Sequence, residues 1–468
     1  MKQMPRNQSL LSINLSRDRE KNAKERGNYM DSVVLSLIVI IVCVALLVFL
    51  GIKGVSPILA GTITAALVSI VSSEGFTTSF FTTFPTSVGN MAKGFFFLFV
   101  VGGCFGGVLE ATGATESIGK GFVKVLGENN WYWPLIIANV LLAATGAVPW
   151  VLMAYISFGL VKRANLPRYI CLVAVAGTMV IAQQCLPGAT TLNNLLTSKA
   201  MGASIYSSPI VGFVTSAIGI ILVVIYIRYL IKDAREKGLG YDAKDEADAK
   251  LRSDDELPNF WLSLIPLLVL LGFTFVYVYI FKQDSTQGVV YATVVSTILL
   301  YVFNRKYIKP GVNIFREMSG QIVRVMPSMV GACVMYGFAS CVAKTSVISS
   351  LAGSLANSSM NPYIIMWLGT MILVAIMANG SSGALSFIGV LGNKLTESGV
   401  NVEAAHRLIN ITSASWDTLP HNSFINAMIP MFGYDIKSGY KYLLISNCVL
   451  PTVYSIIALV LTMILYPC

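Results

Sequence analysis

The stretch Thr412–Asn426 reads TSASWDTLPHNSFIN and places Asp417 and His421 inside the apolar C-terminal third of the chain. A carboxylate and an imidazole at bilayer depth are costly unless they face a cavity or a partner, so they are candidates for a functional site. Pro420 cannot donate a backbone hydrogen bond and disfavours a helical Leu419, which predicts a break in a spanning helix. Such breaks are tolerated where the backbone is buried in protein or lines an aqueous cavity. The stretch therefore predicts either a transporter's substrate site or a kinked core helix around a buried polar pair.

The same pattern occurs once more, 233 residues earlier in the chain. Leu186, Pro187, Thr190, Leu192 and Asn193 correspond in spacing to Leu419, Pro420, Ser423, Ile425 and Asn426. Other interruptions follow in the same order, with 146–149 in the first half corresponding to 379–383 in the second. Paired interruptions at matching positions of two halves point to a transporter binding site. We interpret the chain as two repeats.

Composition places the chain among polytopic membrane proteins. Of its 468 residues, 55% are hydrophobic and 12% are charged, and the mean hydropathy is +0.70, whereas about a quarter of a soluble domain is charged. The net charge of +10 comes mostly from segments between apolar runs, which favours a role in topology and lipid contact over nucleic-acid binding. We expect a multi-pass protein of the cell (cytoplasmic) membrane, with the lipid bilayer as a partner and no nucleic acid.

Motifs for metal, redox and hydrolytic chemistry are missing. The eight cysteines show no CxxC spacing and fall mostly in apolar runs, where cysteine acts as a small buried hydrophobe. His406 and His421 are the two histidines of the chain. GxSxG, HExxH and nucleotide-binding motifs are absent. We expect no disulfide, no cofactor, no histidine-rich metal site, no enzymatic activity and no primary active transport.

The apolar runs predict four segments in chain order. They are a polar N-terminal tail over 1–31, a first transmembrane repeat over 32–231, a charged cytoplasmic connector over 232–257 and a second transmembrane repeat over 258–468. Each repeat should hold about five transmembrane helices, a re-entrant hairpin and a broken helix, which gives an all-α fold. Because five crossings is an odd number, the two repeats should be inverted relative to each other.

Individual elements follow from the apolar runs. Crossing helices are expected at Val33–Leu50, Pro57–Ile70, Gly94–Leu109, Ile210–Leu230, Phe260–Phe281, Val289–Phe303, Val325–Val342 and Tyr442–Leu465. Re-entrant hairpins are expected at Trp133–Leu160 and Tyr363–Leu391, and broken helices from Tyr169 and from His406. Phe76–Lys93 and Lys309–Arg324 are too polar to cross and predict amphipathic arms at the interface. The glycines at 102, 103, 106 and 107 predict close helix packing rather than phosphate binding.

Lysine and arginine usage predicts the orientation. A cytoplasmic connector puts most basic loops inside and both termini outside. The basic residues of the 1–31 tail conflict with that placement. Either its acidic residues make the tail tolerable outside, or Phe76–Lys93 crosses after all.

These residues resemble the gluconate permease (GntP) family of the ion transporter superfamily. The run Asp417-Thr-Leu-Pro-His-Asn422 is similar to that family's most recognisable motif, and Pro187 and Gly188 with Asn194 resemble its first-half motif. The resemblance implies cation-coupled uptake of small hydroxylated or amino carboxylates, such as sugar acids, glycerate, hydroxybutyrate or D-serine. It also implies a homodimer whose transport domains move as elevators past a scaffold, with substrate held by hairpin tips and broken helices.

A carboxylate substrate requires positive potential, and no lysine or arginine is central to a predicted span. Helix N-termini at the tips and breaks can supply it. The residues predicted to bind substrate offer hydroxyl, amide or backbone donors: Thr145, Gly146, Gly188, Thr190, Asn193, Asn194, Asn379, Gly380, Ser381, Ser382, Gly383, Asn422 and Ser423. The alternative for 379–383 is a notch for helix packing.

Asp417 and His421 are predicted to couple an ion to transport. Asp417 would carry a proton or, with carbonyls freed by Pro420, help to hold a sodium ion. His421 has a side chain whose ordinary pKa of about 6.5 suits proton coupling; the alternative is a neutral donor that bridges the break. The leading hypothesis is secondary active symport of a small organic carboxylate, with a proton as the favoured ion. The alternative is an ion-only cation/proton antiporter, which needs Asp417 but not the hydroxyl-rich tips.

Overall fold

Helices make up nearly all of the regular structure in the computed structural model. It describes residues 32–51, 53–127, 130–144, 150–189, 191–243, 252–347, 350, 360–397 and 399–468. Helices satisfy every backbone polar group within one segment, which is what a bilayer demands of apolar runs. Within the described residues, seven helices are long and apolar enough to cross a membrane: Ser32–Gly51, Phe76–Thr112, Pro209–Glu236, Phe260–Val278, Thr286–Tyr307, Ile314–Val342 and Ile436–Leu465.

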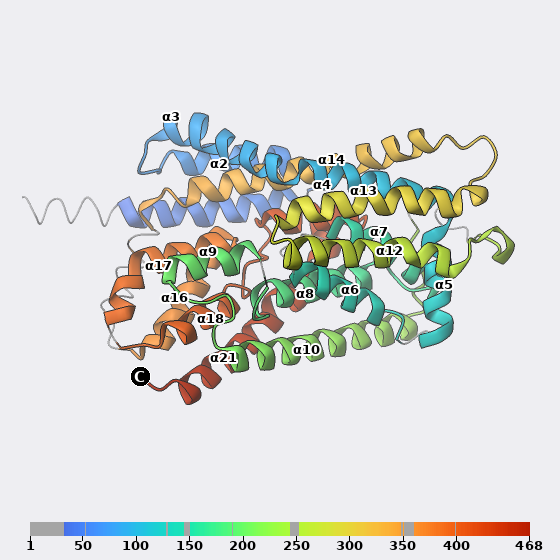
Figure 1. The fold of residues 1–468 in the computed structure, drawn as a ribbon. Coiled ribbons are helices and arrows are strands. Elements are labelled where there is room, and N and C mark those ends of the chain that lie inside the picture. Colours follow the sequence, from blue (N-terminus) through green and yellow to red (C-terminus); the bar gives the residue numbers. More distant parts are fainter. Residues whose placement is uncertain are drawn as a thin grey trace, which may run out of the picture.

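After Ser32–Gly51, the first half of the chain contains two pairs of short helices, α6 with α7 and α8 with α9, among longer helices (Figure 1). Its further helices are α2 (Pro57–Ser69), α3 (Phe76–Thr78), η1 (Ser79–Thr83), α4 (Phe84–Thr112), α5 (Ala114–Leu126), α6 (Trp133–Ala144), α7 (Trp150–Arg163), α8 (Tyr169–Gln184), α9 (Leu192–Met201) and α10 (Pro209–Glu236). The pair α6 and α7 falls where the first hairpin was predicted, and α8 and α9 where the first broken helix was predicted.

The second half presents a similar order of elements. Its helices are η2 (Asp254–Glu256), α12 (Phe260–Phe275), η3 (Val276–Ile280), α13 (Ser285–Asn304), η4 (Arg305–Tyr307), α14 (Ile314–Val342), α16 (Pro362–Met377), α17 (Gly380–Glu397), α18 (Val402–Thr412), α19 (Ser423–Met431), α20 (Ile436–Leu444), η5 (Ile445–Val449) and α21 (Leu450–Leu465). The pair α16 and α17 falls in the second predicted hairpin, and α18 and α19 form the second broken helix.

The two predicted interfacial arms are not separate elements, because both continue into long helices. Phe76 to Thr112 is one continuous helix of 37 residues, and Ile314 to Val342 is one helix of 29 residues. Polar residues in these segments find partners inside the bundle: the Ser69 hydroxyl donates to the Ser79 hydroxyl at 3.0 Å. Pro85 sits in the first turn of α4, directly after the π-helical η1, where its missing N–H does least harm.

Helices α4 and α14 pack antiparallel along their lengths, through glycines. A Cβ at Gly107 would lie 2.7 Å from Met318 Cα, and one at Gly103 would lie 2.9 Å from Ile322 Cα. Gly102 and Gly106 face α7, where a Cβ would lie 2.8 Å from the Val151 side chain and 2.6 Å from the Tyr155 ring. The predicted packing role of this glycine run is confirmed.

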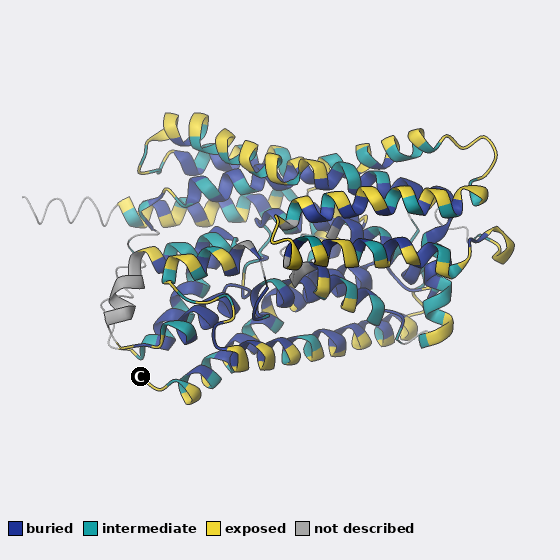
Figure 2. Ribbon diagram, viewed as in Figure 1, coloured by how far each residue is buried: buried dark blue, intermediate teal, exposed yellow. Residues whose placement is uncertain are grey.

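The helices form two groups, and this pair belongs to one of them. The long helices α4, α13 and α14, with α2 and Ser32–Gly51, lie along one side of the molecule, and the hairpins, broken helices, α10 and α21 make up the other (Figure 1). Buried residues fill the interior of both groups, and exposed apolar residues run along the outward faces of the long helices (Figure 2). That exposed apolar surface fits a lipid environment.

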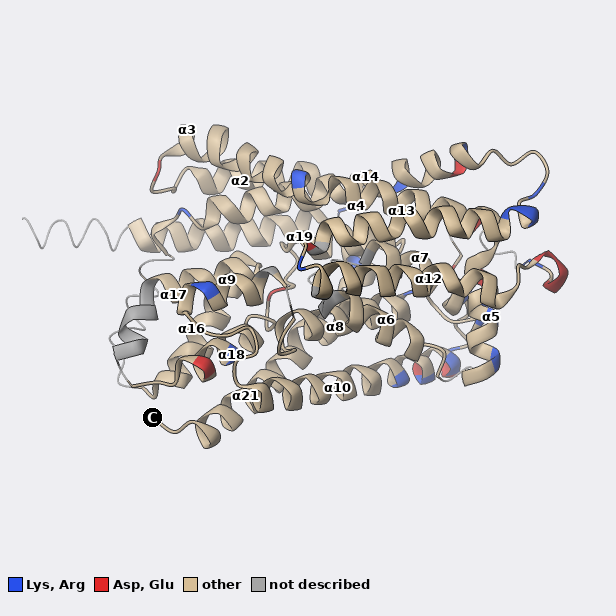
Figure 3. Ribbon diagram, viewed as in Figure 1, with Lys and Arg blue, Asp and Glu red and all other residues tan. Residues whose placement is uncertain are grey.

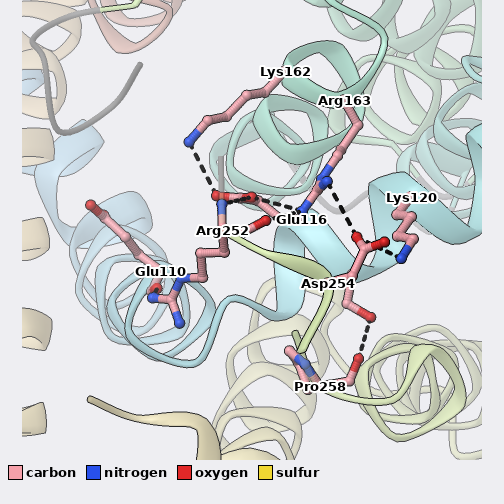
Figure 4. A network of polar contacts seen from close by, with 9 residues as sticks. Glu110, Glu116, Lys120, Lys162, Arg163, Arg252, Asp254 and Pro258 are labelled. Atoms are coloured by element: carbon pink, nitrogen blue, oxygen red, sulfur yellow. Dashed lines mark hydrogen bonds and ion pairs between the residues drawn. The ribbon is translucent and has the colours of Figure 1, made fainter. Parts of the chain in front are cut away.

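Charged residues gather at the end of the bundle where α5 lies (Figure 3). There Glu116 accepts hydrogen bonds from Lys162 at 3.1 Å, from Arg163 at 3.2 Å and from the Arg252 backbone N–H at 3.1 Å (Figure 4). Asp254 pairs with Lys120 at 2.6 Å. This network ties the described end of the connector to α5 and α7. The C terminus and the start of Ser32–Gly51 lie at the opposite end (Figure 1). The predicted tail over 1–31 lies outside the described residues.

Candidate functional site

The second helix break is held open by amide side chains. Between α18 and α19, Asn422 accepts the N–H of Ile425 at 3.0 Å and so caps α19. Its Nδ2 donates to the backbone carbonyls of Asp417, at 2.9 Å, and Ala378, at 2.8 Å. Asn426 Nδ2 donates to the carbonyl of Pro420 at 2.7 Å. The carbonyls that the break frees therefore have partners, as buried backbone requires.

The first break is closed by the same kind of contact. Thr191 caps α9 by accepting the N–H of Asn194 at 3.4 Å. Asn194 Nδ2 donates to the carbonyls of Ala189 at 2.7 Å and Ile205 at 3.2 Å. Gly188 has φ +78°, and a Cβ there would lie 2.2 Å from the ring of Tyr206. This position therefore requires glycine for its conformation and for space.

Asp417 lies where both breaks and one hairpin tip meet. Its Oδ1 accepts from the Gly380 backbone N–H at 2.9 Å and from Asn422 Nδ2 at 3.1 Å. Its Oδ2 accepts from Gln184 Nε2 at 3.0 Å. Gly380 is the first residue of α17, so the carboxylate faces a helix N-terminus, where negative charge is stabilised. Gln184 is the last residue of α8 and stands 233 positions before Asp417, the offset of the sequence repeat.

The tip between α16 and α17 is tightly packed around this carboxylate. Ala378 turns the chain with φ +41°, and Asn379 Oδ1 accepts the N–H of Ser382 at 2.8 Å. A Cβ at Gly380 would lie 3.0 Å from the Ser413 carbonyl. A Cβ at Gly383 would lie 2.6 Å from the backbone of α16, which is the packing role left open for this cluster. Ser381 and Ser382 are half-buried, and Ser423 is buried at the start of α19.

His421 faces a different element from Asp417. Its Nε2 lies 3.3 Å from the Ile376 carbonyl near the end of α16, and its ring meets the Phe338 ring edge to face. The side chain is buried, and Nδ1 has no hydrogen-bond partner among the described residues. These contacts fit the alternative of a neutral donor that bridges the break.

Trp416 takes a backbone conformation that is rare for a bulky residue. Its φ is +61°, in the left-handed region, and 37% of its surface is exposed. Strain of this kind costs about 1–3 kcal/mol and tends to persist at functional segments. It therefore adds to the case for the break as a site.

A buried polar network that the sequence analysis did not assign joins α18 to the first break. Asn193 Nδ2 donates to Asn410 Oδ1 at 2.8 Å and to Ser413 Oγ at 2.9 Å. His406 Nε2 lies 2.8 Å from Asn410 Nδ2, and its Nδ1 lies 2.5 Å from Ser207 Oγ. The spacing of 406, 410 and 413 on one helical face could have indicated this network.

Arg407 is a buried cation next to the site, and the sequence analysis did not assign it a role. Its side chain is fully buried in α18 and donates to the carbonyls of Ser207 at 2.9 Å and Ile205 at 2.7 Å. These carbonyls belong to the segment between α9 and α10. The sequence predicted a broken helix from His406 but not the burial of this guanidinium, which follows from the packing of α18 against that segment.

The remaining predicted positions lie outside the described residues. They are Thr145, Gly146 and Thr190. Within the described ranges, no three residues of the types His, Cys, Asp and Glu come together in a way that could hold a metal ion.

Long apolar helices around two helix breaks that meet at one carboxylate are typical of multi-pass membrane transporters. The chain belongs to the GntP family of permeases, whose family model matches residues 35–466. The suspected resemblance is therefore confirmed.

Relatives cover most of the chain at low identity. An uncharacterized transporter of Bacillus subtilis (strain 168), YxjC, is 21% identical over 450 residues, which cover 87% of this chain and 94% of that protein. An uncharacterized transporter of Haemophilus influenzae is 22% identical over 353 residues, 72% of this chain and 78% of that one. The crystal structure of the Alcanivorax borkumensis YdaH transporter, which has an unusual topology, aligns with 93% of this chain and 97% of its own at 17% identity and a TM-score of 0.38.

Proposed function

We propose that this permease is a secondary active symporter that couples the entry of a proton to the uptake of a small organic carboxylate. The observation that carries the proposal is the set of three contacts made by Asp417, from a hairpin tip, from the first break and from its own break. A titratable group that joins three separate elements can change how they fit together when its charge changes.

The coupling step follows from the hydrogen-bond roles around Asp417. All three of its partners are donors, which matches an ionised carboxylate that only accepts. Protonation places an O–H among these donors, so one of them must turn away. The Gln184 amide can do so by rotating to present its oxygen to the new O–H. That oxygen at present accepts from Ser413 Oγ at 2.7 Å, so the rotation takes it away from Ser413. Proton binding thus weakens the contact between Gln184 at the first break and Ser413 at the second.

An anionic substrate is favoured by the positive potential around the site. When Asp417 is neutral, the N-terminus of α17 is free to receive another carboxylate. The N-terminus of α9 faces the same region through Asn193 and Asn194. Arg407 adds a buried positive charge whose hydrogen bonds go to carbonyl oxygens. In this proposal, substrate carboxylate and proton charge balance each other at the two breaks.

The inverted-repeat and elevator arrangement is part of the same proposal. The order of long helix, hairpin, broken helix and closing helix occurs in both halves, and α4 and α14 pack antiparallel. Gln184 and Asp417 occupy equivalent positions of the repeat and meet each other. The long helices would serve as the scaffold of a homodimer, and the hairpins and broken helices would form the moving part.

Uptake into proteoliposomes tests the proposal. Radiolabelled gluconate, glycerate, hydroxybutyrate and serine would be offered under an imposed proton or sodium gradient, with Asp417→Asn and a control, Asp284→Asn. The control replaces the capping aspartate of α13 with another good cap, so wild-type uptake is expected. We expect gradient-driven accumulation of one acid, reduced at least about tenfold in Asp417→Asn by loss of its charge change.

The same experiment decides between ions and functions. Accumulation under the sodium gradient alone would mean that sodium, and not a proton, is the coupling ion. If no acid accumulates while cation flux still depends on Asp417, the carboxylate proposal fails and the ion-only antiporter takes its place.

A further inference from the structure

A hollow at the connector end of α10 has no place in the proposed transport site. Its volume is about 530 Å³, and it is lined by Asn130, Arg228, Ile231, Lys232, Arg235 and Glu236. Three cationic side chains and one carboxylate therefore surround it. We propose that this hollow binds the phosphate headgroup of an anionic phospholipid.

The arrangement of Arg228 suits a phosphate. Its Nε donates to the Tyr132 hydroxyl at 3.0 Å and its Nη2 lies 3.4 Å from Asn130 Oδ1. These contacts orient the guanidinium, a planar fork that matches phosphate oxygens, while leaving other N–H groups for a ligand. Lys232 pairs with Glu236 at 3.7 Å with both side chains largely exposed, so that ion pair is weak and easily exchanged.

The position of the hollow on α10 favours a lipid over free phosphate. Ile221, Ile225 and Tyr229 are more than half exposed and recur at every fourth residue, so they form one outward stripe. The stripe belongs to a helix long and apolar enough to cross the bilayer, and it continues to Arg228 and Lys232. An acyl chain can lie along the stripe while its headgroup enters the hollow, with the tyrosine at headgroup depth.

A helix C-terminus alone does not account for these residues. Cations in the last turn of a helix complement its dipole. This explains Arg235, because α10 ends at Glu236. Arg228 lies about two turns earlier, where the dipole effect has faded. The side of the membrane also fits, because the lysine and arginine bias places this end in the cytoplasm, next to the leaflet richer in anionic lipid.

The test compares lipids on the purified full-length protein in detergent. The melting temperature would be followed during titration with short-chain phosphatidylglycerol, with phosphatidylcholine of the same chain length and inorganic phosphate in separate arms. The variant Arg228→Gln/Lys232→Gln/Arg235→Gln removes the three cations. The matched control, Arg305→Gln/Lys306→Gln/Lys309→Gln, removes the same charge from the exposed segment after α13.

We expect a saturable rise in melting temperature with phosphatidylglycerol alone. The concentration for half-saturation should increase by at least about tenfold in the first variant, since each cation near the surface contributes to attraction, and should not change in the control. Equal responses of the two variants, or an equal response to phosphatidylcholine, would overturn the proposal. A rise with inorganic phosphate as large as with phosphatidylglycerol would overturn the proposal that the ligand is a lipid, because free phosphate would then bind equally well.

A milder variant guards against misfolding. Lys232→Gln changes one exposed side chain and should weaken the response to phosphatidylglycerol by a smaller factor. Should Lys232→Gln bind as wild type while the triple variant is unfolded, the proposal is rejected. These readouts do not measure transport, so a failure of the lipid proposal can be told apart from a failure of the proposed symport.

Discussion

At the scale of single residues, the space around Gly380 decides whether Asp417 keeps its contacts. In Gly380→Ala the new Cβ would lie 3.0 Å from the Ser413 carbonyl, 3.1 Å from Gln184 Nε2 and 3.2 Å from Asp417 Oδ2. These neighbours must move by a few tenths of an ångström, which disturbs the very hydrogen bonds proposed to carry coupling. We expect uptake to fall several-fold and stability to fall by about 1–3 kcal/mol, as in overpacked cores.

Gly389→Ala supplies the control on the same helix. Nothing lies within 4 Å of a Cβ at Gly389, which is exposed on α17. Alanine there should leave uptake intact and raise stability by about 0.5–1 kcal/mol through helix propensity. Chemical unfolding in detergent and proteoliposome uptake measure both effects. Equal uptake in the two variants would show that the space at Gly380 does not matter for transport.

The sequence predicted this centre only in part, and the reason is chemical. Asp417 stands out because a carboxylate in an apolar run carries a clear signal, and Pro420 and Asn422 mark the break around it. Gln184 carries no charge, so it was not assigned, although it occupies the position equivalent to Asp417 in the repeat. Arg407 was overlooked because its burial depends on packing against the Ile205–Ser207 segment, which no local pattern encodes.

At the scale of elements, the contact between α4 and α14 depends on backbone approach. A Cβ at Gly107 would lie 2.7 Å from the Cα and 2.8 Å from the N of Met318. Backbone atoms cannot rotate away, so in Gly107→Ala the two helices must separate locally. We expect a loss of about 1–3 kcal/mol of stability, measured by thermal unfolding in detergent.

Gly94→Ala is the matched control on α4. It is exposed, and a Cβ there meets nothing within 4 Å, so unchanged or slightly higher stability is expected. Similar losses in both variants would mean that helix α4 itself, and not its contact with α14, is sensitive.

The sequence predicted the helices well where apolar runs are uninterrupted. It missed that two polar segments continue into the long helices that follow them. Threonine, serine and phenylalanine in Phe76–Lys93 suggested an interfacial arm, yet the segment continues into α4 as one helix. The hydroxyls of such a helix are satisfied by its own backbone or by a neighbour, as Ser79 is by Ser69. Polarity along one segment therefore does not exclude a long helix when the partner helix is distant in sequence.

At the scale of the whole molecule, Tyr434 connects the two halves through the connector. Its hydroxyl donates to Asp242 and accepts from the Tyr169 backbone N–H at 3.0 Å. Asp242 in turn accepts from the Arg168 backbone N–H at 2.7 Å. The start of the first broken helix, the connector and the segment after α19 are thus joined by one phenol.

Tyr434→Phe should weaken that connection. It leaves the Tyr169 N–H and one Asp242 oxygen without this partner, so we expect a loss of about 1–3 kcal/mol of stability and faster limited proteolysis within 232–257.

The stability should also depend on pH through this phenol. Burial raises the pKa of Tyr434, and so does the Asp242 carboxylate that accepts its hydrogen bond. A phenol whose pKa is raised by folding stabilises fully below its ordinary pKa of about 10 and loses this contribution as the pH rises further. The wild type should therefore lose more stability than Tyr434→Phe between about pH 9 and pH 11, one unit either side of that value. Tyr291→Phe, at an exposed tyrosine on α13, should behave as wild type throughout, and a Tyr434→Phe variant with wild-type stability and proteolysis would show that the halves are held together without this contact.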